Sequence, residues 1–400
     1  MTSFTSGNTQ NKSDCRVEFT PETTGGLSIS VNTKVEVMYG DSIRELSLDT
    51  LHELGIEHGT LQIDDAGALP FVIMARIEAV VKTAFPDCKR AALPEWKEFC
   101  RYKSSREHLR RSRLYIPGNQ PKLMLNAGLH KPDGIILDLE DSVAPPEKLS
   151  ARFIVRNALR VIDFFGVERL VRVNQGALGL ADLEEIVPHN VHLILLPKIE
   201  TADQMHQVDA KIAEVSKRCG RTEPVFLMPI IESALGILNA LSIATASPNN
   251  VALAIGLEDY TADLGTQRTL DGKESFFARS MIINAARAAG LQPIDTVYSD
   301  VADMVGLRKS VEQSRAMGFD GIGCIHPRQI APINEAFTPT EDEISKAKRI
   351  VVAFDDAQKR GLGVVSLGSK MIDPPVVKRA VRTIDMAVAY GKLAADWKQS

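Results

Sequence analysis

The chain has 400 residues, of which 44% are hydrophobic and 24% charged, so it can bury a barrel of ~250 residues plus a smaller module. Its net charge of −4 argues against a nucleic-acid partner. The sequence has no apolar run of ~18 residues that would span a membrane, and its polar start and five scattered cysteines indicate a cytoplasmic protein with reduced thiols and no zinc site.

Residues 1–85 are predicted to form a small α+β module. Alternating apolar residues over 27–31 indicate a strand, and apolar residues at helical spacing over 43–54 indicate a helix that stops at the following glycine. The Asp-Asp-Ala-Gly stretch at 64–67 lies between two apolar runs and predicts a hairpin. A last helix would complete the module.

Residues 86–112 contain more basic than acidic side chains, and we interpret them as a basic linker. The simpler interpretation is a solvated tether or connecting helix. The alternative is a surface that contacts the phosphates of a thioester carrier, because clustered Lys and Arg side chains bind phosphate oxygens well.

Between residues 113 and 340, short apolar runs alternate with segments compatible with helices. Eight such runs occur, at 113–118, 134–140, 169–174, 193–200, 225–231, 251–259, 295–300 and 321–327. Buried parallel strands have this near-continuous apolar character, so eight successive units predict an α/β fold of the (β/α)8 TIM-barrel type. An open doubly wound sheet is the alternative, but no GxGxxG motif follows the first run.

Polar residues follow nearly every predicted strand, at the rim where such a barrel places its active site. They are Asp138, Glu140, Asp141, Arg172, Asn174, Lys198, Glu200, Glu232, Glu258, Asp259, Asp300 and His326. Several carboxylates without a Cys/His cluster favour a hard cation held by oxygen, Mg²⁺ rather than Zn²⁺. A single arginine among them could clamp a substrate carboxylate or neutralise a developing oxyanion. The residues alone therefore indicate a metal-assisted barrel enzyme.

Each of these groups also has a purely structural explanation. Acids directly after strands often cap or begin the next helix, which could apply to Asp138, Asp141, Glu232 and Asp259. Arg172 could belong to a buried ion network. Lys198 could form an ion pair, or could be a Schiff-base lysine. His326, at a strand end, could be structural.

Eight motifs, in order from Arg110 to about Gly391, together resemble the citrate lyase β-subunit-like family. They are RRSRLYIPGNQPKLM, GIILDLEDSVAPPEK, LVRVN, LLPKIE, PIIESALGILN, IGLEDYTADLG, IHPRQI and KMIDPPVVKRA. This HpcH/HpaI aldolase/citrate lyase superfamily also holds malyl-CoA and citramalyl-CoA lyases. The resemblance implies a Mg²⁺-dependent lyase that splits a carboxylated 3-hydroxyacyl thioester of the citryl, malyl or citramalyl type into an acyl thioester and a 2-oxo acid.

The resemblance also implies roles for individual residues. Glu232 and Asp259 match the two magnesium ligands of the family, and Arg172 matches the arginine that holds the substrate and stabilises the transition state. Glu140 and Asp141 match an acidic pair that orders metal-bound water. Contacts to the acyl-CoA or acyl-carrier thioester are expected from Asn119, Lys122, His326 and Pro327.

Residues 341–400 are expected to form a C-terminal helical lid or oligomerisation segment. Asp373, in the MIDPP motif, matches an aspartate that reaches a neighbouring subunit's site as a proton donor. The resemblance therefore implies a homo-oligomer, a trimer in many members of the family.

Residues 8–85 resemble the citrate lyase γ-subunit, an acyl carrier that bears a CoA-like phosphopantetheine group on a serine. The family's modified serine lies in a Ser-Ser-Asp stretch, whereas this chain has Lys12-Ser13-Asp14. Because Lys12 occupies the modified position, we favour a vestigial carrier and free acyl-CoA as the substrate. Modification of Ser13 would instead imply a tethered thioester.

Two other functions remain compatible with the residues. One is a Schiff-base aldolase that acts through Lys198. The other is a non-catalytic assembly subunit of a citrate lyase-like complex. The intact set of Arg172, Glu232 and Asp259 argues against the second, because a retired site should lose its charges first.

Overall fold

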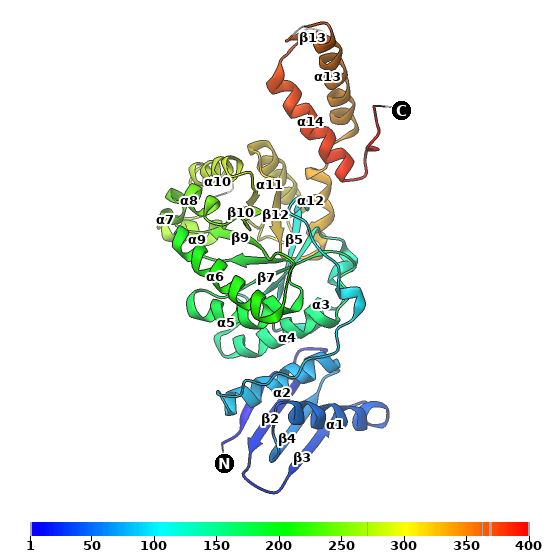
Figure 1. The fold of residues 1–400 in the computed structure, drawn as a ribbon, viewed down its shortest axis with the longest axis vertical. Helices are drawn as coiled ribbons and strands as arrows, with labels where there is room; N and C mark the ends of the chain where they lie inside the picture. Colours follow the sequence, from blue (N-terminus) through cyan, green and yellow to red (C-terminus); the bar gives the residue numbers. More distant parts are fainter. Residues whose placement is uncertain (1, 270, 362, 368–369, 399–400) are drawn as a thin grey trace. The chain divides into compact units, whose positions relative to one another are not determined.

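Figure 1 shows the computed structural model of the chain, which describes residues 2–269, 271–361, 363–367 and 370–398. Met1–Ile330 and Ala331–Ser400 form two compact units. The first unit contains a small N-terminal sheet and a closed barrel. The second contains the C-terminal helices.

The N-terminal module is a four-stranded sheet covered by two helices. Its strands lie in the order β1-β2-β4-β3, with β3 parallel to β4 and the other neighbours antiparallel. The elements are β1 (Phe4–Ser6), β2 (Cys15–Pro21), β3 (Leu27–Asn32), α1 (Glu36–Glu53), β4 (Gly59–Asp65) and α2 (Pro70–Ala84). Apolar side chains of β2, β4 and α2 form one core, which confirms the predicted α+β module.

The predicted hairpin at residues 64–67 is wrong. Strand β4 ends at Asp65, whose carboxylate accepts hydrogen bonds from the backbone N–H groups of Gly67 (2.9 Å) and Ala68 (2.7 Å). Pro70 then opens helix α2, in which every residue from Phe71 to Val81 is buried. A helix that is buried on all faces lacks the polar side of an amphipathic helix, so its sequence resembles that of a buried strand.

The linker packs against the barrel as a largely irregular segment. Among its described residues, the regular element is the short 3-10 turn η1 (Glu98–Cys100). Arg110 is buried and pairs with Glu168 at 2.7 Å, while Arg111 pairs with Asp133 at 2.8 Å. Both acids lie at or just before the beginnings of barrel strands. The linker therefore lies at the end of the barrel opposite the predicted active site, so neither a solvated tether nor a phosphate-binding surface at that site describes it.

Eight parallel strands close into a barrel, and the predicted (β/α)8 fold is confirmed. The strands are β5 (Ser112–Pro117), β6 (Gly134–Asp138), β7 (Glu168–Arg172), β8 (Leu193–Leu196), β9 (Phe226–Ile231), β10 (Ala252–Ile255), β11 (Gln292–Asp295) and β12 (Gly321–Cys324), which pairs with β5. The covering helices are α3 (Pro121–Met124), α4 (Lys148–Val161), α5 (Gly176–Ile186), α6 (Ala202–Cys219), α7 (Ala234–Leu238), α8 (Ala240–Thr245), α9 (Leu257–Asp263), α10 (Phe276–Ala288) and α11 (Met304–Met317). Short 3-10 turns are η2 (Ala127–His130), η3 (Pro145–Glu147), η4 (Val187–His189) and η5 (Pro327–Gln329).

The seventh strand lies earlier than predicted. It covers Gln292–Asp295 rather than 295–300, because the second half of the predicted run forms a loop that leads into α11. In this loop, Asp300 accepts backbone hydrogen bonds from Ala302 and Asp303. Asp300 is therefore a loop residue, and Asp295 is the acid at the end of the strand.

The C-terminal unit is mainly helical and begins at Ala331, ten residues before the segment expected at 341–400. Its elements are α12 (Ile330–Phe337), α13 (Glu341–Lys359), β13 (Val365–Leu367), β14 (Lys370–Ile372) and α14 (Pro374–Ala389), of which the two short strands were not predicted. Apolar residues of α13 and α14 pack around Phe354 and Trp397. Across the part of the chain that the structure describes, no helix is long and apolar enough to cross a membrane.

Candidate active site

An arginine–aspartate pair links the ends of two neighbouring strands. Asp138 is the last residue of β6, and Arg172 is the last residue of β7. The guanidinium donates two hydrogen bonds to the Asp138 carboxylate, from Nε (2.6 Å) and Nη2 (2.7 Å). The same carboxylate accepts from the backbone N–H groups of Glu140 (3.0 Å) and Ser142 (3.2 Å). Asp138 therefore orients the arginine and fixes the loop that follows β6.

The acidic pair after β6 faces the same arginine. Arg172 Nη1 lies 3.1 Å from Glu140 Oε2 and 3.9 Å from Asp141 Oδ2. Glu140 is buried and also accepts a hydrogen bond from Gln175 (2.9 Å), whereas Asp141 is more exposed. Burial raises the pKa of Glu140 although Arg172 opposes the shift. The backbone N–H groups of Glu140 and Ser142 donate to Asp138, and that of Asp141 donates to Glu140 Oε2 (3.0 Å), so a helix-capping role does not explain Asp141.

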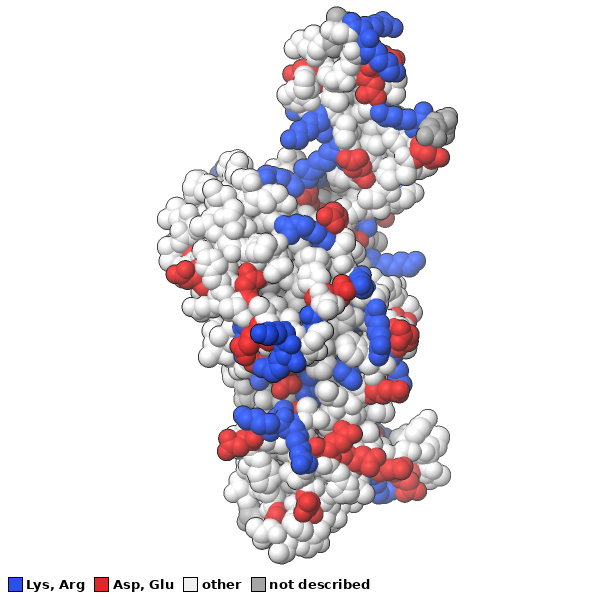
Figure 2. Space-filling model, in the orientation of Figure 1, with Lys and Arg blue, Asp and Glu red and all other residues white. Residues whose placement is uncertain are grey.

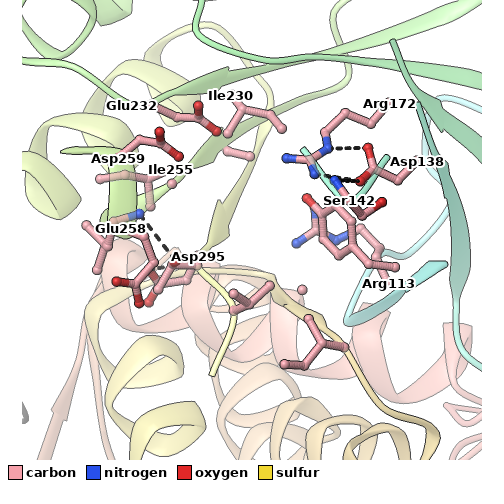
Figure 3. Close-up of a pocket in the computed structure, with 18 residues that line it drawn as sticks. Arg113, Asp138, Ser142, Arg172, Ile230, Glu232, Ile255, Glu258, Asp259 and Asp295 are labelled. Atoms are coloured by element: carbon pink, nitrogen blue, oxygen red, sulfur yellow. Dashed lines mark hydrogen bonds and ion pairs between the residues drawn. The ribbon is translucent and has the colours of Figure 1, made fainter. Parts of the chain in front are cut away.

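Glu232 and Asp259 come from the next part of the rim. Glu232 directly follows β9, and Asp259 lies in the first turn of α9 after β10. A Cβ atom on Gly256 would lie 2.7 Å from Glu232 Cγ, so this glycine makes the space in which the glutamate lies. Figure 3 shows the two carboxylates on the same side of the cavity.

The Glu232 carboxylate is buried without full compensation. Its side chain is almost inaccessible, and among the described residues Oε2 has no hydrogen-bond partner. Burial, followed by the charge of Asp259, raises the pKa of Glu232 to about 8. An unpaired buried carboxylate beside a second acid is costly unless a cation binds there, so this pair fits a divalent metal.

Lys198 lies between the two groups of acids. It follows β8 with a left-handed φ of 52°, a conformation that is uncommon for a lysine. Its Nζ is 3.3 Å from Asp259 Oδ1, 3.6 Å from Glu140 Oε1 and 3.7 Å from Asp141 Oδ2. Burial would lower the pKa of Lys198, but the three carboxylates outweigh it and raise that pKa. The structural alternative of an ion pair is therefore confirmed.

Asp138, Arg172, Glu232 and Asp259 line a cavity of about 270 Å³, whereas Glu140, Asp141 and Lys198 lie outside its lining. Figure 3 shows Glu232, Glu258 and Asp259 on one side, and Asp138 with Arg172 on the other. Among the residues that the structure describes, no group of three Asp, Glu, His or Cys side chains forms a complete metal cage. Two carboxylates nevertheless suit Mg²⁺, which keeps several waters or takes oxygens from its substrate.

Four predicted carrier contacts lie at this rim but outside the cavity lining. Asn119 follows β5 and donates to Glu147, Lys122 lies on α3, and His326 with Pro327 follows β12. The backbone N–H of Arg328 donates to His326 Nδ1 at 3.2 Å, so this histidine begins η5. Asp373 belongs to the C-terminal unit, where it accepts from the backbone N–H of Val376 and begins α14.

Sequence reasoning missed two residues that line the cavity, Tyr115 and Arg113, and assigned no role to a third, Asp138. Asp138 was noted only as one of many rim acids, although it is the bidentate partner of Arg172. Tyr115 lies beneath that arginine, 5.3 Å from the guanidinium carbon to the ring centroid. Arg113 lies deeper in the same cavity. The signal for the last two was the alternation of Arg113 and Tyr115 in β5, which turns both side chains toward the barrel interior.

The fold and this rim define a class: barrel enzymes that hold an oxygen-rich substrate between a pair of acids and a clamped arginine. Comparison with known proteins gives the family. The HpcH/HpaI aldolase/citrate lyase model matches residues 111–327. The citrate lyase β-subunit of Leuconostoc mesenteroides subsp. cremoris is 40% identical over 286 residues, which is 71% of this chain and 95% of that protein. The chain therefore belongs to the HpcH/HpaI aldolase/citrate lyase family and is a carbon–carbon lyase.

Two further relatives extend this comparison. Mitochondrial citramalyl-CoA lyase of Mus musculus is 34% identical over 72% of this chain and 90% of its own. A crystal structure of protein CitE from Mycobacterium tuberculosis, in complex with magnesium, acetoacetate and coenzyme A, is 30% identical. The match covers 71% of this chain and 99% of that chain, with a TM-score of 0.59.

The N-terminal module has a separate match. Residues 4–84 fit an ACP family model described as malonate decarboxylase delta subunit (MdcD). By comparison, the alignment with the citrate lyase β-subunit from Leuconostoc takes 95% of that protein but 71% of this chain. This chain thus joins a lyase barrel to a module similar to an acyl carrier.

Proposed function

We propose that this chain is a Mg²⁺-dependent lyase that cleaves a carboxylated 3-hydroxyacyl thioester into an acyl thioester and a 2-oxo acid. This proposal rests mainly on one observation: Glu232 and Asp259 lie opposite the Arg172–Asp138 pair across one cavity. A magnesium ion held by the two acids would supply a Lewis acid for the oxygens of the 2-oxo acid. The relative solved with magnesium, acetoacetate and coenzyme A supports this assignment.

Arg172 has the geometry for the charge that develops during cleavage. Breaking the carbon–carbon bond gives the oxo acid and leaves the electron pair on the thioester fragment as an enolate, which must then be protonated. A guanidinium that is already oriented by Asp138 stabilises such an oxyanion without having to reorganise. The Tyr115 ring lines the cavity next to the arginine and gives that side of it an apolar face.

The acidic loop after β6 would position water and the substrate hydroxyl. Glu140 is held by Arg172 and Gln175, so its carboxylate has a fixed direction. Asp141 is less constrained and lies within 3.7 Å of Lys198 Nζ. We assign this pair the ordering of water at the metal, and Lys198 the electrostatic link between the pair and Asp259.

The Schiff-base alternative through Lys198 is disfavoured by the same contacts. A lysine forms an imine only as the neutral amine, and enzymes lower its pKa for that purpose. Here three carboxylates within 3.3–3.7 Å stabilise the ammonium form. Borohydride treatment in the presence of pyruvate should therefore trap no adduct on Lys198.

The N-terminal module supports a substrate that enters as free acyl-CoA. Asp14, next to Ser13, is fully buried and accepts two hydrogen bonds from Arg76 (3.0 and 2.7 Å). Arg76 also donates to Ser150 at the beginning of barrel helix α4 (2.7 Å). A carrier must move its arm between sites, whereas these contacts fix the Ser13 loop to the barrel. We infer that the module is a fixed extension of the barrel.

We also propose a homo-oligomer, with Asp373 acting in the site of a neighbouring copy. Large apolar side chains are exposed on neighbouring helices α7, α8 and α10, namely Leu235, Leu238, Leu241, Phe276 and Phe277. Figure 2 shows that this side of the barrel has few charges. Such a patch is typical of a subunit interface. Mixing inactive Asp373→Asn and Glu232→Gln subunits should restore activity, and failure to restore it would refute action between subunits.

The function is tested with pure protein, Mg²⁺ and citryl-, malyl- and citramalyl-CoA, with coupled detection of the 2-oxo acid. We expect cleavage of at least one thioester, loss of cleavage in EDTA and recovery when Mg²⁺ is added back. If none of the three is cleaved although magnesium binds, free CoA thioesters are not the substrates. A mass increase on Ser13 would then identify a tethered carrier.

A further inference from the structure

One buried cation in the barrel has no structural partner. Arg113 is 2% exposed, and no carboxylate pairs with it in the described part of the chain. Its Nη1 donates to the thioether sulfur of Met228 (3.1 Å), a weak acceptor, and its Nε has no partner. Burying a guanidinium in this way costs several kcal/mol, so some other group is expected to offset the charge.

Other buried arginines of this chain are compensated by neighbouring groups. Arg76, Arg110 and Arg156 each pair with a fully buried carboxylate at 2.6–2.7 Å. Arg169 also lacks a carboxylate and has an Nε without a partner, but its two terminal nitrogens donate to backbone carbonyls and it lies 4.2 Å from the centroid of the Tyr102 ring. Arg113 therefore differs from the structural arginines in the same fold.

The position of Arg113 connects it to the active-site cavity. It lines this cavity together with Arg172 and Glu232. On its two neighbouring strands it pairs with Gly134 and Gly323, and a Cβ on Gly134 would lie 3.3 Å from Arg113 Cγ. Gly134 thus leaves lateral space for the long side chain. Figure 3 shows Arg113 on the Arg172 side of the cavity, opposite Asp259.

The charges around the cavity show what this arginine can bind. Among the described lining residues, the cations are Arg172 and Arg113. Arg172 is already neutralised by Asp138 and Glu140. The lining acid Asp295 is occupied by Arg279, so it does not compensate Arg113. An anionic group that enters the cavity would therefore find its free positive charge at Arg113.

We propose that Arg113 binds a second carboxylate on the oxo-acid portion of the substrate, which makes it a specificity-determining residue. This inference rests on the proposed lyase function. The 2-oxo acid from a citryl thioester, oxaloacetate, ends in a carboxylate, whereas those from citramalyl and malyl thioesters, pyruvate and glyoxylate, end in a methyl group and a hydrogen. Arg113 therefore selects the citryl type.

The test compares the binding of oxaloacetate and pyruvate, each with Mg²⁺, by isothermal titration of the full chain. Wild type should bind oxaloacetate more tightly than pyruvate. Arg113→Met should weaken oxaloacetate binding by ~10- to 100-fold, the size expected for one lost charged hydrogen-bond pair, and change pyruvate binding by less than about threefold. Its thermal midpoint should stay the same or rise, because an unpaired buried charge has been removed.

Two further variants control for folding. Arg113→Lys retains the charge without the planar fork, and it should lose less oxaloacetate affinity than Arg113→Met. Arg110→Met removes a paired buried arginine at the opposite end of the barrel; it should lower stability and leave the ratio of the two affinities unchanged.

The outcomes separate this inference from the lyase function. If wild type does not prefer oxaloacetate, or if Arg113→Met keeps the wild-type ratio, the role of Arg113 is refuted. Mg²⁺-dependent cleavage of citramalyl- or malyl-CoA would then leave the lyase function intact. If wild type cleaves no thioester and binds neither oxo acid with Mg²⁺, the proposed function and the role of Arg113 both fail.

Discussion

Two polar regions of the first unit use the same residue types in opposite ways. Between helix α2 of the N-terminal module and barrel helix α4, each buried charge has an opposite charge: Arg76 meets Asp14, and Arg156 meets Glu78. In the active-site cavity, one oxygen of Glu232 and one nitrogen of Arg113 are buried without partners in the described structure. Satisfied networks hold parts together, whereas unsatisfied groups are available for ligands.

The largest expected effect comes from the unsatisfied region. Glu232→Gln should reduce kcat/KM by roughly 10³-fold or more, because it removes a ligand of the ion that supports the reaction. The thermal midpoint should not fall, since a buried carboxylate without a partner on Oε2 is replaced by a neutral amide. Steady-state assays and calorimetry measure both properties.

The matched control uses a carboxylate of the satisfied region. Glu185 pairs with Arg156 at 2.9 Å, so Glu185→Gln should lower stability and leave kcat/KM within about twofold of wild type. If Glu232→Gln is destabilised while Glu185→Gln loses activity, the distinction between the two regions is wrong.

The second effect is on stability. Arg156→Met should lower the free energy of unfolding by up to ~3–5 kcal/mol, because the fully buried Glu78 loses its bidentate partner and keeps Lys82 (2.9 Å) as its remaining cation. Pairing it with Glu78→Met should recover much of this loss, since no unpaired charge remains. Urea unfolding of the two variants measures the difference. A loss below ~1 kcal/mol for the single variant would show that the interface does not depend on this pair.

The fold was predictable where the pattern was local. Eight apolar runs separated by helical segments predicted the barrel, and seven of them contain most of the strand that forms. The run at 295–300 failed because only its first residue belongs to β11. Helix α2 was taken partly for a strand because it is buried between the module's sheet and α4, a contact between segments far apart in sequence.

The candidate site was predictable where residues end strands. Glu232 and Arg172 were found this way, and the structure brings both to one cavity. Arg113 was not found, because the search considered residues at the C-terminal ends of strands. Arg113 stands at the beginning of its strand, in the motif RLYIP. Its significance depends on the absence of a partner across the barrel, which only the closed fold reveals.

The third expected effect is a loss of stability at low pH, caused by a buried histidine that contacts the linker. His192 Nδ1 accepts from the backbone N–H of Arg169, and Nε2 contacts the carbonyl of Tyr102 at 2.9 Å. Burial, and next the charge of Arg169, lower the pKa of His192 from 6.5 to about 3. Between these values the unfolded chain binds the proton and the folded chain does not. Stability is therefore complete above about pH 6.5 and is lost as the pH falls.

From pH 7 to pH 5, His192 should account for a loss of about 2 kcal/mol in the free energy of unfolding. Urea unfolding at both values should show this loss reduced in His192→Gln. The exposed His206 is the control, and His206→Gln should retain the full pH dependence. Equal slopes for wild type and His192→Gln would mean that His192 is protonated in the folded chain.

The smallest effect is expected where a linker charge is paired but exposed. Lys103 contacts Glu223 at 2.6 Å, with 70% and 44% of the side chains exposed. Such a pair contributes ~0–1 kcal/mol, because water and salt screen it, so Lys103→Ala should barely change the urea midpoint.

The same variant tests the linker as a carrier-binding surface. Since the linker packs at the end of the barrel opposite the cavity, KM for an acyl-CoA should be unchanged, whereas a several-fold increase that weakens with salt would show that linker cations do contact the phosphates of the substrate.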